Sequence, residues 1–177
     1  MANYKILTPF VRYYEGGFSN NMNDPGGATM RGVTLATFRA VYGKSKTVAE
    51  LKNITDAQWD NIFKSYYWDK CKADLLDNQS IANMLVDFAW HSGVSTAVKK
   101  IQKIVGVDDD GIMGRVTIGA VNGYYRGSVS VFDALKAARM NFLRTRQNWN
   151  SFKNGWTKRV EAIKYGSLSY SDNVIKC

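Results

Sequence analysis

Apolar residues recur at helical spacing in successive short segments of this 177-residue chain, and several of these segments end at glycine. Residues 4–15 are the first, with apolar side chains at i, i+3 and i+4 spacing and Gly16-Gly17 directly after them. Such periodicity is typical of amphipathic helices, and glycine commonly ends them. The sequence therefore predicts a mainly α fold.

The same reasoning places the other helices. Thr34 and Thr55 are N-cap candidates, and the helix after Thr55 has Asp56 in its first turn. The apolar stripe of that helix consists of Trp59, Ile62, Phe63 and Tyr66. We expect Glu50 to lie in a surface turn. The remaining helices are predicted over residues 34–42, 79–92, 94–106, 115–123, 128–147 and 151–165.

One segment, residues 18–33, interrupts the helical pattern. Its sequence, FSNNMNDPGGATMRGV, holds four Asn or Asp residues, one proline and three glycines. These residue types favour turns and break helices. We expect a loop or short β-hairpin here, after the first helix.

Charge divides the chain unevenly. Residues 1–93 carry 10 Lys+Arg and 9 Asp+Glu, a net charge of +1, whereas residues 94–177 carry 14 and 6, a net charge of +8. A basic half indicates an anionic partner, which could be nucleic acid, an anionic membrane or a cell-wall polymer. No Pro- or Ser-rich linker marks the boundary. We therefore expect parts 1–93 and 94–177 to pack together as one unit.

Several functional classes are excluded by what the sequence lacks. His91 is the only histidine, which argues against a Ser-His-Asp triad and rules out a multi-His zinc site. No Walker A or dinucleotide fingerprint occurs, and we expect neither metal nor cofactor. Cys71 and Cys177 could form a disulfide, but two free thiols of a protein made in a reducing compartment are the favoured interpretation. No apolar run is long enough to span a membrane, so we expect no stable membrane insertion.

Glu15 differs from the other glutamates because it is the last residue of the first predicted helix. The negative end of the helix dipole and nearby aromatic side chains would both raise the pKa of its carboxyl group. A raised pKa suits a general acid working near neutral pH. The structural alternative is an ion pair between Glu15 and Arg12 or Arg31.

Asp24 and Thr29 follow in the turn-rich segment. A carboxyl group on a helix end and another on a glycine-rich turn could flank a bound sugar, and glycoside hydrolysis commonly uses such a pair. Thr29 could orient a water molecule. The structural alternatives are an Asx-turn for Asp24 and a β-turn hydroxyl for Thr29.

These residues resemble the signature of glycoside hydrolase family 108, the N-acetylmuramidases of phages, prophages and bacteria within the lysozyme superfamily. The similarity extends in order over nearly the whole chain. It is carried by Glu15-Gly16-Gly17-Phe18, Asn23-Asp24-Pro25-Gly26-Gly27-Ala28-Thr29, Gly32-Val33-Thr34, Tyr67-Trp68-Asp69-Lys70-Cys71, Ala73-Asp74-Leu75, Asp87-Phe88-Ala89, Ser92-Gly93, Asp110-Gly111-Ile112-Met113-Gly114 with Thr117, and Gly155-Trp156 with Arg159.

The resemblance implies a lysozyme-like helical fold and a peptidoglycan hydrolase that cleaves the β-1,4 bond between N-acetylmuramic acid and N-acetylglucosamine. Glu15 would be the catalytic acid, and its spacing to Asp24 and Thr29 is similar to the Glu-Asp-Thr set of phage-type lysozymes, where the threonine lies one residue later. Substrate contacts are implied for Phe18, Gly27, Arg31, Tyr67, Trp68 and His91. Two positions depart from the family pattern: Met30-Arg31 replaces an expected Asn-Lys or Asn-Arg, and His91 replaces an asparagine.

The basic rear half resembles the family's C-terminal peptidoglycan-binding-like region. Its cations and aromatics suit an anionic sugar polymer, although they could equally form a solvated face over a core. We expect a monomeric endolysin with antimicrobial activity, made in the cytoplasm without a signal peptide and released to the wall by a holin. The alternatives are a catalytically inactive wall-binding or phage structural module and, on charge alone, a nucleic-acid-binding protein; no nucleic-acid-binding motif accompanies the charge.

Overall fold

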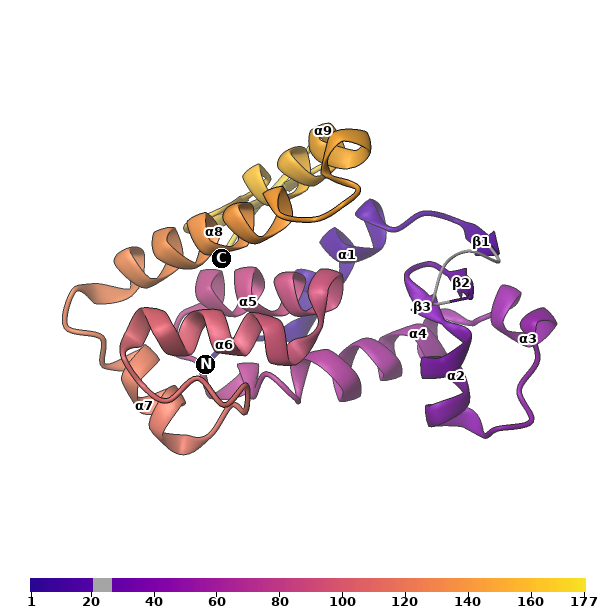
Figure 1. Cartoon of the computed structure of the whole chain (residues 1–177), viewed down its shortest axis with the longest axis horizontal. Coiled ribbons are helices and arrows are strands. Elements are labelled where there is room, and N and C mark those ends of the chain that lie inside the picture. The colour runs from indigo at the N-terminus through magenta and orange to yellow at the C-terminus, as the bar shows by residue number, and fades with distance from the viewer. Residues whose placement is uncertain (21–26) are drawn as a thin grey trace.

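The computed structural model describes residues 1–20 and 27–177 of the chain. These residues form helices and two small sheets, arranged as shown in Figure 1. The helices are α1 (Tyr4–Tyr14), α2 (Leu35–Tyr42), α3 (Val48–Lys52), α4 (Asp56–Phe63), α5 (Gln79–Ser92), α6 (Val94–Val105), α7 (Arg115–Asn122), α8 (Gly127–Arg144) and α9 (Trp149–Glu161), with a π-helical turn η1 (Lys64–Trp68) and a 3₁₀ turn η2 (Ala73–Leu75). The strands are β1 (Phe18–Asn20), β2 (Ala28–Met30), β3 (Val33–Thr34), β4 (Ile163–Lys164), β5 (Ser167–Tyr170) and β6 (Asn173–Lys176).

The predicted mainly α fold with a short β segment after the first helix is confirmed. Strands β1, β2 and β3 form an antiparallel sheet in which Ser19 pairs with Thr29. Two predicted helix starts are also confirmed, because the side chains of Thr34 and Thr55 accept hydrogen bonds from backbone N–H groups three residues later. Local capping signals therefore located these helix ends.

Two predictions in the front half were wrong. Glu50 lies in helix α3 rather than in a turn, and it forms a reciprocal capping box with Thr47. Tyr66, expected in the buried stripe of α4, is 36% exposed. The reason is that α4 continues into the π-helical turn η1, whose wider winding moves the following residues off the face set by Trp59 and Phe63.

The C-terminal end differs from the helix predicted through residue 165. Helix α9 ends at Glu161, and β4, β5 and β6 then form a second antiparallel sheet. Gly166 has a φ of +80°, the left-handed conformation that glycine adopts without strain, and it lies in the turn between β4 and β5. Tyr170 of β5 packs edge-on against Phe10 of α1, so this sheet lies against the first helix.

One hydrophobic core joins both halves of the chain. It extends from Leu7 in α1 to Leu168 in β5, and ten consecutive residues of α5, from Ser80 to Ala89, are buried. Helix α5 packs against α6 and α8, and α8 and α9 lie side by side (Figure 1). Gly93, at the expected boundary, is only the one-residue junction between α5 and α6. Within the described residues, no helix is long and apolar enough to cross a membrane.

Candidate active site

Glu15 is the C-terminal cap of α1, and its backbone N–H donates to the carbonyl of Val11 at 3.1 Å. Its side chain is 13% exposed and opens into a cavity of about 560 Å³. Four parts of the chain meet at this cavity: the end of α1, the β2–β3 region, the end of α5 and the middle of α9. The lining residues are Tyr14, Glu15, Thr29, Gly32, Trp90, His91, Gly155, Trp156 and Arg159.

Two donors hold the same oxygen of the Glu15 carboxyl group. Trp90 Nε1 donates to Glu15 Oε1 at 2.6 Å, and Arg159 Nη1 donates to that oxygen at 2.8 Å. Oε2 instead lies over Gly32, whose φ is +77°. A Cβ at this position would overlap Oε2 and lie 2.8 Å from Cζ2 of Trp90. The carboxyl group is thus clamped through Oε1, and a glycine leaves room for Oε2.

Arg159 belongs to a buried ion network behind the carboxyl group. Its Nη2 donates to Asp87 Oδ1 at 2.7 Å and its Nε to Asp87 Oδ2 at 3.1 Å, while Arg139 Nη2 forms an ion pair with Oδ2 at 2.7 Å. Asp87 and Arg139 are fully buried. The Asp87 carboxylate therefore lies between two guanidinium groups, and the Glu15 carboxyl group is bound to one of them. Ion pairing and bidentate geometry are what make burial of ionised groups tolerable.

The network changes the titration of its members. Burial alone would raise the pKa of Asp87, but the charges of Arg159 and Arg139 outweigh it and hold that pKa well below its ordinary value. For Arg159, burial acts to lower the pKa, yet Asp87 and Glu15 raise it above the ordinary value. Both groups therefore stay ionised at neutral pH.

His91 lies in the cavity wall on the last turn of α5. Burial, followed by repulsion from Arg139 and Arg159, lowers the pKa of His91 to about 4. Its ring meets Trp156 edge-on, with centroids 5.2 Å apart. Within the described residues, Nδ1 is buried without a hydrogen-bond partner. A neutral imidazole thus borders the cavity at neutral pH, and its predicted substrate contact stays a prediction.

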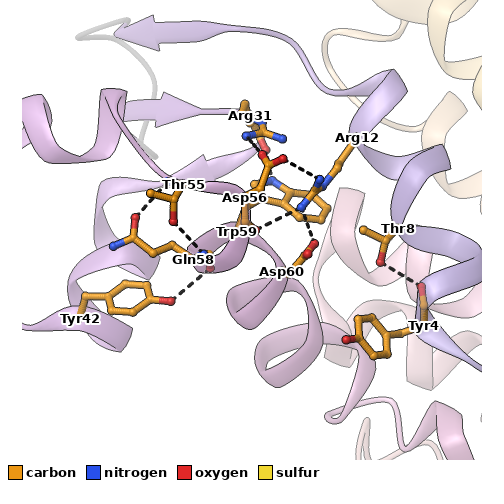
Figure 2. Close-up of polar contacts among 10 residues, drawn as sticks. All are labelled: Tyr4, Thr8, Arg12, Arg31, Tyr42, Thr55, Asp56, Gln58, Trp59 and Asp60. Carbon is orange, nitrogen blue, oxygen red and sulfur yellow. Dashed lines mark hydrogen bonds and ion pairs between the residues drawn. The ribbon is translucent and has the colours of Figure 1, made fainter.

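The predicted alternative for Glu15, a pair with Arg12 or Arg31, was wrong about the partner. Arg12 Nη1 and Arg31 Nη1 both bond Asp56, at 3.1 and 2.7 Å, and Arg12 also pairs with Asp60 at 2.6 Å (Figure 2). These contacts tie α1 and the β2–β3 turn to the start of α4. Arg12 and Arg31 are thus bound to α4, and the guanidinium group that reaches Glu15 comes from the other half of the chain.

The turn-rich segment, residues 18–33, contributes two described residues to the cavity, Thr29 and Gly32. Thr29 lies on β2 in the cavity wall, and its hydroxyl donates weakly to the carbonyl of Gly27 at 3.4 Å. Gly27 has a φ of +62° and is not among the lining residues. Asp24, the expected second carboxylate, lies outside the described residues.

The other predicted substrate contacts lie behind or beside the cavity. The ring of Tyr67 is tilted by 59° against Trp90, with centroids 4.6 Å apart, and burial, then the charge of Glu15, raises the pKa of the Tyr67 hydroxyl. Trp68 is fully buried and donates to Asp74 at 2.6 Å, so it is a core residue, and it is not among the residues that line the cavity at Glu15. The ring of Phe18 on β1 lies under Lys52 Nζ at 4.3 Å, away from the cavity lining.

Trp90 and Arg159 were missed as partners of Glu15, as was the steric role of Gly32. Arg159 lies 144 residues after Glu15 in sequence. The signal that could have drawn attention to it was its place in the family resemblance, together with Gly155-Trp156. Gly32 was part of the family resemblance, in Gly32-Val33-Thr34, but that pattern gave no indication of its steric role.

A carboxyl group held at the wall of an open cleft, with aromatic rings and cations around it, is the kind of site that glycoside hydrolases use. The family profile described as Glycosyl hydrolase 108 matches residues 8–93. A solved structure, that of Brucella abortus SagA, is 37% identical, covers 90% of each chain and superposes with a TM-score of 0.80. No curated protein sequence matches the chain. The chain belongs to the glycosyl hydrolase 108 family and is a glycoside hydrolase.

Proposed function

We propose that the protein is an N-acetylmuramidase, which cleaves the β-1,4 bond between N-acetylmuramic acid and N-acetylglucosamine in bacterial peptidoglycan. The observation that carries the proposal is the Glu15 carboxyl group, clamped at Oε1 and open to the cavity. Family membership supports the glycosidic bond and the peptidoglycan substrate.

We assign separate roles to the two oxygens of Glu15. Oε1 accepts hydrogen bonds from Trp90 and Arg159, so Oε2 is the oxygen that carries the proton. In the reaction, Oε2 gives this proton to the glycosidic oxygen, the bond to the anomeric carbon breaks, and water completes hydrolysis. Arg159 then compensates the carboxylate charge that forms. Thr29, which also lines the cavity, is proposed to orient the water, and Asp24 is the proposed second carboxylate.

The first experiment is Glu15→Gln, which keeps the side chain's size but cannot donate a proton as an acid does. We expect it to abolish release of reducing ends from purified peptidoglycan while the circular dichroism and the unfolding midpoint stay close to wild type. Full activity in this variant would refute the role of Glu15. Mass spectrometry of the released muropeptides distinguishes muramidase, glucosaminidase and amidase products, and intact wall that binds without being cut would identify a binding module.

We also propose that the protein acts in phage or prophage host lysis, is made in the cytoplasm and reaches the wall through a holin. This part rests on the sequence resemblance alone. The test is expression in a host with and without a co-expressed holin, with culture turbidity as the readout. Lysis that is equally fast without the holin would contradict it.

A further inference from the structure

Helix α9 carries a row of aromatic residues that leads away from Glu15. Trp149, Phe152 and Trp156 are spaced by three and four residues, and Arg159 follows three residues later. Residues at this spacing share one helix face. At 1.5 Å rise per residue, the row extends about 15 Å from Arg159 to Trp149, which is room for more than one sugar ring.

The row is continuous with the catalytic cavity. Trp156 lines the cavity, and Phe152 stacks on it with centroids 5.6 Å apart and an interplanar angle of 22°. Phe152 is 53% exposed and packs on Trp156 rather than on the hydrophobic core. An exposed aromatic ring in isolation is ordinary. Here, however, Phe152 stacks on Trp156, which lines the cavity that contains the proposed acid.

Gly155 provides a second, independent observation. It lies inside α9 and lines the cavity, and a Cβ there would meet no protein atom within 4 Å. Glycine inside a helix is destabilising relative to alanine. Because Gly155 lines the cavity, this open space is part of the cavity, and a ligand that enters it can approach the helix backbone closely here.

We infer that Trp156, Phe152 and Gly155 form a glycan-binding subsite for the N-acetylhexosamine rings of the peptidoglycan strand next to the cleaved bond. This inference rests on the proposed function. Pyranose rings present an apolar face of C–H groups, and aromatic faces bury such a surface with defined orientation. Gly155, next to Trp156 in the sequence, lets the sugar ring and its acetamido group approach the helix. The subsite thus binds the sugar, while Glu15 performs the chemistry.

The test uses peptide-free glycan strands prepared from purified wall as the probe. The main variant is Gly155→Leu, which fills the free space, and Gly119→Leu is its matched control. Gly119 is also an exposed glycine inside a helix, α7, with no protein atom near its absent Cβ. Both variants replace glycine by a better helix former, so a purely structural effect would be the same in both.

We expect Gly155→Leu to raise KM for the strands about tenfold or more while kcat stays close to wild type, because a blocked subsite removes binding energy. Phe152→Ala should raise KM several-fold, and Gly119→Leu should behave as wild type. In a Glu15→Gln background, calorimetric Kd values should rise by the same factors.

Equal KM and Kd values in Gly155→Leu and Gly119→Leu would overturn the subsite, while cleavage by wild type would leave the proposed function intact. If the wild-type protein does not cleave the strands, the proposed function is refuted, and the binding measurement alone tests the subsite. Strands that bind wild type and bind Gly155→Leu more weakly would support it; strands that bind neither protein, or both equally, would overturn it.

Discussion

Replacing Arg159 by leucine should damage stability and catalysis together. The substitution removes three hydrogen bonds to Asp87 and one to Glu15, all within a network where Asp87 is fully buried. Asp87 would keep only its pair with Arg139, and Glu15 only its bond from Trp90. Removing one partner from a buried ion network lowers the free energy of unfolding by about 3–5 kcal/mol, because a buried charge is left without full compensation.

The cost converts into measurable shifts. In a protein of this length, 1 kcal/mol corresponds to about 2–4 °C in Tm, so Arg159→Leu should melt about 6–20 °C below wild type. Most molecules would stay folded at 25 °C if total stability is in the usual range of about 5–15 kcal/mol. Without its guanidinium clamp the Glu15 carboxyl group moves, and misplacement by about 1 Å can cost about a hundredfold in rate.

The assays are urea unfolding followed by tryptophan fluorescence, and reducing-end release from purified wall at 25 °C. Arg159→Lys keeps the charge but cannot bond both carboxylates, so it should fall between wild type and Arg159→Leu in both assays. The matched control is Arg144→Leu, an exposed arginine on α8, which should change stability by less than about 1 kcal/mol. If Arg159→Leu is as stable as this control, or if its kcat is unchanged, the network does not work as described.

Three further outcomes follow from the structure. Gly32→Ala should lower kcat at least about tenfold and also reduce stability. The reason is that a side chain at φ +77° is strained and its Cβ overlaps the Glu15 carboxyl group. An unchanged kcat would contradict this prediction. Because the pKa of His91 falls from 6.5 to about 4 on folding, the unfolded chain binds more protons in this window, and stability should decrease as pH drops from 6.5 to 4, by up to about 3 kcal/mol. His91→Asn should flatten that dependence in pH-resolved urea titrations, and an unchanged slope would show that another group is responsible. Rising salt should slow lysis of whole wall more than hydrolysis of a short neutral oligosaccharide, because it screens the net charge of +8 on residues 94–177; equal sensitivity of the two rates would remove charge attraction as a factor.

Local signals in the sequence were sufficient for much of the fold. The caps at Thr34 and Thr55 and the stop at Gly93 depend on residues within one helical turn, and each was located correctly. Helix α3 was missed although its capping box, Thr47 with Glu50, is also a local signal. The end of α9 was placed too late, because the amphipathic pattern does not distinguish its last turn from the first strand of the following sheet.

The candidate site depends partly on local sequence and partly on long-range packing. Glu15 at a helix end before two glycines was recognisable from the sequence, and the structure places it at the cavity. Its true ion-pair partner was not recognisable, because Arg12 and Arg31 are nearer in sequence and carry the same charge. Only the packed structure shows that Asp56 engages both of these arginines.

The sequence by itself determined the helices, the β segment after the first helix, the candidate acid and the family resemblance, since periodicity, caps and turn residues act over a few positions. Only the tertiary structure decided which charged side chains form ion pairs with one another. Helices α1, α5, α8 and α9 must pack on one core before Asp87 can join Arg139 and Arg159, and before Arg159 can reach Glu15. Buried charges require compensation wherever the fold brings them together, and that requirement leaves no periodic trace along the chain.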